Sequence, residues 1–295
     1  MLISNAGKMM QDKLVLVIGG AGFVGSHLVD YLLNSGAIVH CLDNFFTGSL
    51  ENISPDCVIH NCNSADINLI EFGCSFDFVF HLGEYSRVEQ SYLDIDLVFE
   101  YNHNSIYGIL KFVKSHNAKL IYSGSSTKFG DYKEKEMLSP YAWTKLKNVD
   151  LIIHYAHWHQ IEFAITYFYN VYGPRELAVG NYATLIGKYL NLVKSGVVEL
   201  PVVLPGSQIR NFTHVQDIVS GLVLVALKGS GDGHGIGAGE GYSILDVVEM
   251  LGCSPVFIES RKGNRLSASV HTEKILTLGW NQEKNLLDYL SGVNS

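Results

Sequence analysis

The chain of 295 residues lacks several features that would define its class at once. No apolar run is long enough to cross a bilayer, and residues 1–12 lack the apolar core of a signal peptide. Basic residues number 21 against 29 acidic ones, which excludes a general nucleic-acid binder because such a protein needs a basic face. The five cysteines are odd in number and form no C-x-x-C pair, so we expect them reduced, in a cytoplasmic protein.

A metal site is not indicated either. His154, His157 and His159 lie close together, but only the first two would share a helix face. No nearby cysteine or carboxylate completes a ligand set. We therefore expect histidines of the surface or of a subunit contact, and no metal.

What the chain does contain is a glycine-rich turn after an apolar run. Residues 14–18 are apolar, and Gly19, Gly22 and Gly25 follow with the spacing G-x-x-G-x-x-G. Glycine lets the backbone turn tightly and approach phosphates, and the N-terminus of the next helix offers N–H groups to an anion. Asp43 ends the second apolar run, where a carboxylate can bind both ribose hydroxyls of NAD and would repel the 2′-phosphate of NADP. The pattern predicts a site for NAD.

Strand and helix signals alternate through the first half of the chain. This alternation predicts an α/β fold, a Rossmann-type doubly wound parallel sheet with helices on both faces. We expect strands at 14–18, 37–42, 57–60, 77–81, 118–122 and 162–167, and helices at 23–35, 92–116 and 141–159.

The pattern is less regular after Pro174, where glycines and prolines interrupt it. We expect a smaller C-terminal substrate-binding lobe there, formed by 172–206 and 231–295. The NAD-binding domain is assigned to 13–171 together with about 207–230. The residues before Lys13 are expected to form a loosely attached tail.

A tyrosine and a lysine four residues apart follow a serine-rich turn. Pro140 suits the first helical position, so Tyr141 and Lys145 should share one face of a helix. A phenol with a pKa near 10 is a poor base at neutral pH, but a nearby ammonium favours the phenolate. Lys145 can also hydrogen-bond the nicotinamide ribose. Ser125, which follows an apolar strand, is the candidate to bind the reacting hydroxyl and relay its proton to Tyr141.

With these motifs the chain resembles the extended short-chain dehydrogenase/reductase family, in the branch that acts on nucleotide sugars. The resemblance runs from about Lys13 to Trp280. Further motifs carry it: Asp66-Ile67, His81-Leu82-Gly83, Asn102, Asn170-Val171-Tyr172-Gly173-Pro174, residues 210–217, Arg261-Lys262-Gly263 and Leu278-Gly279-Trp280.

The resemblance implies a tightly bound NAD and a nucleotide-diphosphate sugar as substrate. It implies cofactor contacts by Gly19, Gly22, Phe23, Val24, Gly25, Asp43, Asn44, Asp66, Ile67, Leu82, Gly83, Asn102, Tyr141, Lys145 and Tyr169. Substrate contacts are expected from Tyr85, Arg87, Ser125, Ser126, Thr127, Asn170, Arg210 and Arg261. Planar guanidinium groups suit the diphosphate because they bind its oxygens in pairs. For Arg87 the alternative is a structural ion pair with Glu84 or Glu89.

The turn after Ser125 departs from part of the family. The 4,6-dehydratases carry an Asp-Glu pair there and the decarboxylases typically a Glu, whereas this chain has Ser126 and Thr127. Dehydration therefore lacks its acid and base, and the 4-epimerases, with small hydroxyl residues in this turn, fit better. Further departures at Gly83-Glu84-Tyr85, Lys128 and Tyr167 suggest an unusual sugar or an unusual fate of the 4-keto product.

These residues predict an oxidation at C4 of the sugar. Tyr141 with Ser125 takes the O4 proton as hydride leaves C4, while Lys145 holds the cofactor. The 4-keto intermediate is then reduced on its other face, which gives 4-epimerisation, or it is released. Release defines a 4-dehydrogenase whose NADH is reoxidised by a second substrate. A noncatalytic NAD(H)-sensing protein is less favoured, because a sensor needs no tuned base.

The resemblance also implies a homodimer through a four-helix bundle, or a higher oligomer, and a role in surface polysaccharide synthesis. The helices expected at 92–116 and 141–159 carry apolar stripes that either form this bundle or pack on the sheet. The stripes consist of Ile106, Ile109, Leu110 and Val113 on one helix and Leu151, Ile152 and Tyr155 on the other.

Overall fold

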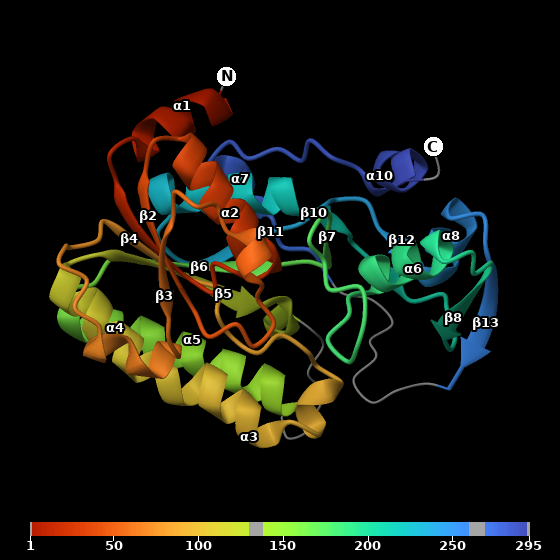
Figure 1. Ribbon diagram of the computed structural model, residues 1–295, viewed down its shortest axis with the longest axis horizontal. Helices are drawn as coiled ribbons and strands as arrows, with labels where there is room; N and C mark the ends of the chain where they lie inside the picture. The colour runs from red at the N-terminus through yellow and green to blue at the C-terminus, as the bar shows by residue number, and fades with distance from the viewer. Residues whose placement is uncertain (1, 130–137, 260–268, 294–295) are drawn as a thin grey trace.

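The computed structural model describes residues 2–129, 138–259 and 269–293, and it is built around one parallel sheet. The strand order is β11-β6-β5-β4-β1-β2-β3, which confirms the Rossmann-type fold (Figure 1). The bounds are β1 (Leu14–Ile18), β2 (Ile38–Asp43), β3 (Val58–Asn61), β4 (Phe78–His81), β5 (Lys119–Ser125), β6 (Phe163–Phe168) and β11 (Gly231–Ile236). The first six strands lie where the apolar runs predict them, because parallel strands are covered on both faces.

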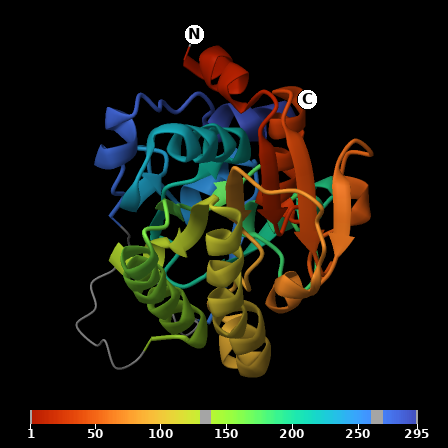
Figure 2. The ribbon, with the colours of Figure 1, turned by 90° about the vertical axis from the view of Figure 1, so that its left-hand side faces the viewer.

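Helices cover both faces of the sheet (Figures 1 and 2). Alternate residues of β1 divide between two cores, with Val15 and Val17 in one and Leu16 and Ile18 in the other. The first core contains residues of α1 (Leu2–Met10), α2 (Phe23–Asn34) and α7 (Val215–Lys228), and the second those of α4 (Asn104–His116) and α5 (Pro140–His159).

The apolar stripes of α4 and α5 face inward. Ile106, Ile109, Leu110, Val113 and Ile152 are fully buried in the second core. These side chains therefore pack on the sheet of their own chain. Packing on the sheet was the alternative to a four-helix bundle between two subunits.

The helix expected at 92–116 is not continuous. It consists of α3 (Ile95–Val98), a π-helical turn (Phe99–His103) and α4. The π turn carries Asn102 into the interior, where its Oδ1 accepts a hydrogen bond from the Tyr85 N–H at 2.7 Å. Such a turn breaks the 3.6-residue repeat on which the sequence prediction rested.

Two segments differ from the expected domain limits. Met10 of α1 is fully buried in the first core, so the start of the chain is anchored by this residue. Residues 231–236, assigned by the sequence to the lobe, form β11 at the edge of the sheet. This strand reads Gly-Asp-Gly-His-Gly-Ile and carries no apolar run. Glycine is required at 235, because a Cβ there would lie 1.9 Å from the carbonyl oxygen of His271.

The smaller lobe has its own core, built around Tyr172, Tyr189, Leu200, Val202 and Val247. Its larger elements are α6 (Leu185–Lys194), β8 (Glu199–Val203), α8 (Ile244–Met250), β13 (Ser254–Ile258) and α10 (Leu286–Val293). Short elements join lobe and sheet: β7 (Val171–Tyr172), β9 (Ile209–Arg210), β10 (Thr213–His214), β12 (Tyr242–Ser243) and α9 (Glu273–Thr277). The lobe lies beyond the carboxyl ends of the strands, where open α/β sheets bind ligands (Figure 1).

Short 3₁₀ turns complete the described chain, at Leu50–Asn52, Ser64–Leu69, Gln90–Tyr92 and Ser126–Phe129. No helix within the described residues is long and apolar enough to span a membrane.

Candidate active site

The glycine turn joins β1 to α2 with very little space between them. Gly19 adopts a φ of +82°, and a Cβ on Gly25 would lie 2.0 Å from the Gly19 carbonyl oxygen. Helix α2 begins after Gly22, which has no side chain to cap the first N–H groups. The turn therefore presents backbone donors and the positive end of a helix dipole to an anion.

Asp43 lies at the carboxyl end of β2, next to this turn. Its carboxylate accepts hydrogen bonds from Ala21 N at 2.9 Å and Phe45 N at 2.8 Å. Burial raises the pKa of Asp43, and these two backbone hydrogen bonds act against that rise. Asp43 borders a small cavity together with Asn44, Leu82 and Gly83. The carboxylate is thus held in place beside a space that suits the ribose of a dinucleotide.

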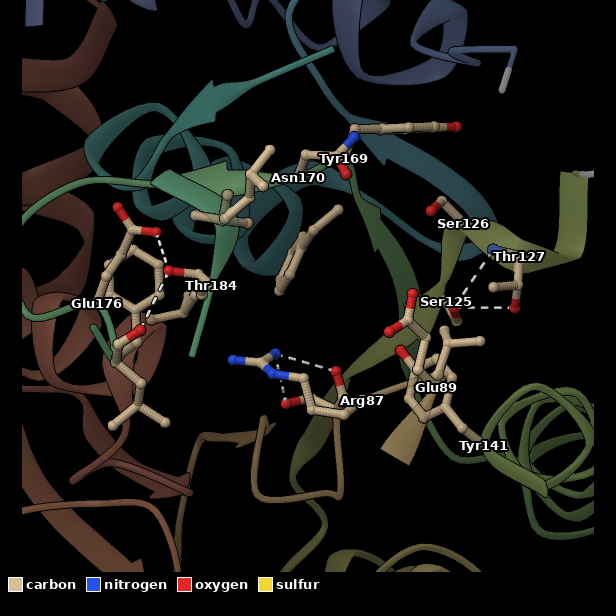
Figure 3. A pocket seen from close by; sticks show the side chains of 18 of the residues that line it. Arg87, Glu89, Ser125, Ser126, Thr127, Tyr141, Tyr169, Asn170, Glu176 and Thr184 are labelled. Atoms are coloured by element: carbon tan, nitrogen blue, oxygen red, sulfur yellow. Dashed lines mark hydrogen bonds between the residues drawn. The ribbon is translucent and has the colours of Figure 1, made fainter. Parts of the chain in front are cut away.

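A larger cavity of about 870 Å³ lies between the carboxyl edge of the sheet and the lobe. Ser125, Tyr141 and Lys145 line it together with the glycine turn. Further predicted residues line it as well: Phe23, Val24, Ser126, Thr127, Tyr169, Asn170 and Arg210 (Figure 3). The predicted catalytic and cofactor groups therefore meet in one space, although they come from distant parts of the chain.

Helix α5 positions the tyrosine and the lysine. Ser139 caps the helix by accepting a hydrogen bond from Ala142 N, and Pro140 occupies the first turn. Lys145 Nζ donates to the carbonyl oxygen of Ser123 at 2.6 Å. Ser125 Oγ, at the end of β5, accepts a hydrogen bond from Thr127 Oγ1 at 2.9 Å (Figure 3).

Arg87 enters the same cavity as a nearly buried cation. Its Nε donates to the carbonyl oxygen of Tyr182 at 2.8 Å. Within the described residues it pairs with neither Glu84 nor Glu89, the two structural partners considered above. Burial lowers the pKa of Arg87, and the neighbouring Tyr141, Tyr85 and Glu176 act against this. Its terminal nitrogens bind the Tyr182 and Ser86 oxygens, so within the described residues its charge is not neutralised by a carboxylate. A guanidinium group of this kind in a cavity suits an anionic ligand.

Three residues predicted to contact the cofactor lie away from the two cavities. Asp66, Ile67 and Asn102 line neither of the two cavities. Asn102 instead holds the segment after β4, through Tyr85 N, and donates to Thr144 Oγ1 at 3.1 Å. Arg261 lies outside the described residues.

The departures at Lys128 and Tyr167 also have a structural explanation. Tyr167 Oη donates to Asp232 at 2.6 Å, and Lys128 binds the same carboxylate. Neither side chain lines the two cavities. The three residues therefore connect β6, β11 and the turn after Ser125. Tyr85 borders the small cavity, and its hydroxyl donates to Asp94 at 2.8 Å.

Sequence reasoning considered Glu84 only as a departure and as a partner of Arg87, and gave Glu176 no role, yet both residues line the large cavity. Glu84 is the more informative of the two, because it contacts Lys145 directly. Glu176 accepts hydrogen bonds from Gly173 N at 2.9 Å and Gly187 N at 3.3 Å. A carboxylate three residues after an apolar strand was the available signal for Glu84. No group of three or more potential metal ligands was found within the described residues.

Fold and site together define a class of dinucleotide-dependent enzymes. The chain belongs to the NAD dependent epimerase/dehydratase family, whose model matches residues 15–238. NAD is the cofactor of this family, and the narrow glycine turn and the fixed Asp43 fit it.

The chain is similar to characterised and named proteins over most of its length. A Methanocaldococcus jannaschii protein, provisionally named a UDP-glucose 4-epimerase, is 26% identical over 95% of this chain and 97% of its own. The Bos taurus dTDP-D-glucose 4,6-dehydratase is 27% identical over 91% of this chain and 84% of its own.

Solved structures show the same fold. The UDP-glucose 4-epimerase of Thermotoga maritima, solved with UDP-glucose, has a TM-score of 0.88 and 25% identity, with 94% of this chain and 96% of that chain covered. The UDP-glucose 4-epimerase of Thermus thermophilus, solved with NAD, has a TM-score of 0.82 and 25% identity, with 95% and 99% covered.

Proposed function

We propose that this protein is an NAD-dependent 4-epimerase of a nucleotide-diphosphate sugar. The observation that supports this most strongly is the shared cavity of Ser125, Tyr141 and Lys145 with the glycine turn. Bound NAD supplies the hydride acceptor and donor for such a reaction. Tyr141 takes the proton from the O4 hydroxyl, Ser125 binds that hydroxyl, and Lys145 stabilises the phenolate.

The turn after Ser125 favours epimerisation over dehydration. Ser126 and Thr127 line the cavity and supply hydroxyl groups, not the acid and base that removal of water needs. The carboxylates of Glu84 and Glu176 are already engaged, the first with Lys145 and the second with backbone N–H groups. The test below also distinguishes a dehydration, because its product differs from a C4 epimer.

The substrate's diphosphate provides the negative charge that this cavity can bind. Arg87 and Arg210 both line the cavity, and Asn170 stands between sheet and lobe. In Figure 3 Arg87 reaches into the space between Glu176 and Tyr141. A guanidinium group there can donate to phosphate oxygens and hold the sugar end near Ser125 and Tyr141.

The experiment that tests the proposal incubates the purified protein with NAD and a panel of UDP-, GDP- and dTDP-sugars. Reduced-nicotinamide absorbance and NMR of the products are followed together. A C4 epimer without net NADH is the expected result. Accumulating NADH, or a 4-keto sugar formed with an added keto acceptor, assigns the 4-dehydrogenase activity instead. A 4-keto-6-deoxy product contradicts the argument from Ser126 and Thr127.

The same experiment also tests the alternative of a noncatalytic NAD(H)-sensing protein. If the protein binds NAD but converts no sugar of the panel, the enzyme proposal fails for those sugars. NAD binding without conversion of any sugar favours the noncatalytic sensing protein.

A further inference from the structure

Glu84 is a buried carboxylate at the junction of the two cavities. It follows β4 by three residues and borders both the small cavity beside Asp43 and the large cavity beside Tyr141. Its side chain is only 1% exposed. A carboxylate in such a place costs free energy unless charges and hydrogen bonds compensate it.

The compensation comes from β4, β5 and α5. Lys145 Nζ lies 2.5 Å from Oε2, and Tyr122 Oη donates to the same oxygen at 2.9 Å. Asn148 Nδ2 donates to Oε1 at 3.0 Å, and His81 Nε2 lies 3.3 Å from it. Strand β5 and helix α5 therefore each contribute a donor to Glu84, and α5 also contributes a cation.

This arrangement keeps Glu84 ionised. Burial by itself raises the pKa of Glu84, but the Lys145 ammonium and the neighbouring donors outweigh burial and hold the pKa well below its usual range. Lys145 has three N–H groups. One donates to the Ser123 carbonyl oxygen and a second faces Glu84, which leaves one for a ligand in the cavity.

The negative charge of Glu84 also matters for the binding of the cofactor. An ammonium alone beside the nicotinamide would repel the oxidised cofactor, which carries a positive charge on that ring, more than the neutral reduced form. Arg87 adds a second cation to the same cavity. Glu84 is the carboxylate in contact with Lys145, so it offsets this repulsion at short range.

We propose that Glu84 is a positioning residue that fixes Lys145 and, as its counter-charge, makes the site favour NAD over NADH. The proposal uses the NAD site of the family and needs no assumption about the sugar. The proposal is therefore tested by measuring cofactor binding without sugar. A negative result there would contradict the role of Glu84 and would leave the proposed epimerase activity untouched.

The test measures the dissociation constants of NAD and NADH separately, on full-length protein freed of cofactor, by calorimetry. Glu84→Gln keeps the shape and removes the charge. We expect it to weaken NAD at least about tenfold more than NADH, as loss of a nearby charge in a site of low dielectric implies. Lys145→Met removes the opposite charge, and we expect the ratio of the two constants to move in the opposite direction.

Tyr122→Phe is the matched control. It removes a hydrogen bond to Glu84 but leaves both charges, so both dissociation constants should change by the same factor. A purely structural role of Glu84 predicts the same equal change for Glu84→Gln. An unchanged ratio of the two constants in Lys145→Met would show that the ammonium does not repel the oxidised cofactor, so that there is no repulsion for Glu84 to offset. Either result overturns the proposal, and Lys145→Met still tests it should Glu84→Gln not fold.

Discussion

At the scale of single residues, Tyr141 is the group on which the proposed chemistry depends most. It lines the cavity with Ser125 and Lys145. Replacement by phenylalanine removes the acid/base group and little else. We expect Tyr141→Phe to lower kcat by about 10²- to 10⁴-fold, the usual contribution of general acid–base catalysis.

Steady-state kinetics and NAD titration of the same preparation check this prediction. NAD affinity should stay within a few-fold of the parent value, because the phenol is not the main anchor of the cofactor. Tyr107→Phe, at an exposed position of α4, is the control and should change neither quantity. Full activity of Tyr141→Phe would remove Tyr141 from the mechanism.

At the scale of elements, the contact of β1 with α2 depends on Gly25. A Cβ there would lie 2.0 Å from Gly19 O and 2.9 Å from Gly20 Cα, both of them backbone atoms that cannot move aside alone. We expect Gly25→Ala to destabilise the fold by about 1–3 kcal/mol, the usual cost of overpacking. NAD affinity should fall about tenfold or more, since the phosphate-binding turn must open.

Urea unfolding and NAD titration measure the two effects. Gly239→Ala is the control, because a Cβ at that glycine would meet nothing within 4 Å. Equal NAD affinity in Gly25→Ala and the parent would show that the turn does not bind the cofactor.

Helix α7 carries a pH-sensitive cap. His214 Nδ1 accepts a hydrogen bond from Gln216 N at 3.2 Å, so the cap needs this nitrogen unprotonated. Burial lowers the pKa of His214 to about 4, and the Lys284 ammonium and His27 add to this. The unfolded chain, with a pKa near 6.5, then binds more protons between these values. Stability is full above pH 6.5 and is lost as the pH falls towards 4.

For His214 alone the expected loss at pH 5 is ~2 kcal/mol. His214→Asn retains a good capping residue without a titrating group. We expect a smaller loss of unfolding free energy between pH 7 and pH 5 in this variant, measured by urea unfolding at both values. His234, whose pKa burial also lowers to about 4, leaves a residual pH dependence. An unchanged pH dependence in His214→Asn would refute the role of this cap.

At the scale of the whole molecule, Trp280 attaches the C-terminal segment to the NAD-binding domain. It is buried in the first core, and its Nε1 donates to Asp217 O at 3.0 Å. Asp217 in turn accepts hydrogen bonds from the N–H groups of Glu283 and Lys284. The segment that leads to α10 of the lobe is thus fixed to α7.

We expect Trp280→Ala to destabilise the protein by about 3–5 kcal/mol, because it leaves a large cavity. Trp280→Phe keeps most of the ring and loses the donor, so it should cost about 1 kcal/mol. Urea unfolding distinguishes the two. Equal costs would mean that the hydrogen bond, and not the packing, holds the segment.

Much of the fold was predictable because its signals are local. The buried strands β1, β2, β4, β5 and β6 contain apolar runs, and the turn after β1 needs glycine whatever lies elsewhere. The strand β11 was not predictable, since its residues carry no β-pattern and pair only because β6 offers an open edge. The break at Asn102 was missed for a similar reason, because its partners Tyr85 and Thr144 are distant in sequence.

The sequence by itself determined the parallel sheet, the dinucleotide turn with Asp43, and the identity of the residues proposed for catalysis, since each follows from residue type at short spacing. Only the tertiary structure decided that Glu84 pairs with Lys145 and that Arg87 enters the cavity with no carboxylate partner in the part of the chain that the structure describes. The physical reason is that charge pairing and burial depend on distances between segments, and the packing of β4 and α5 against β5 sets those distances.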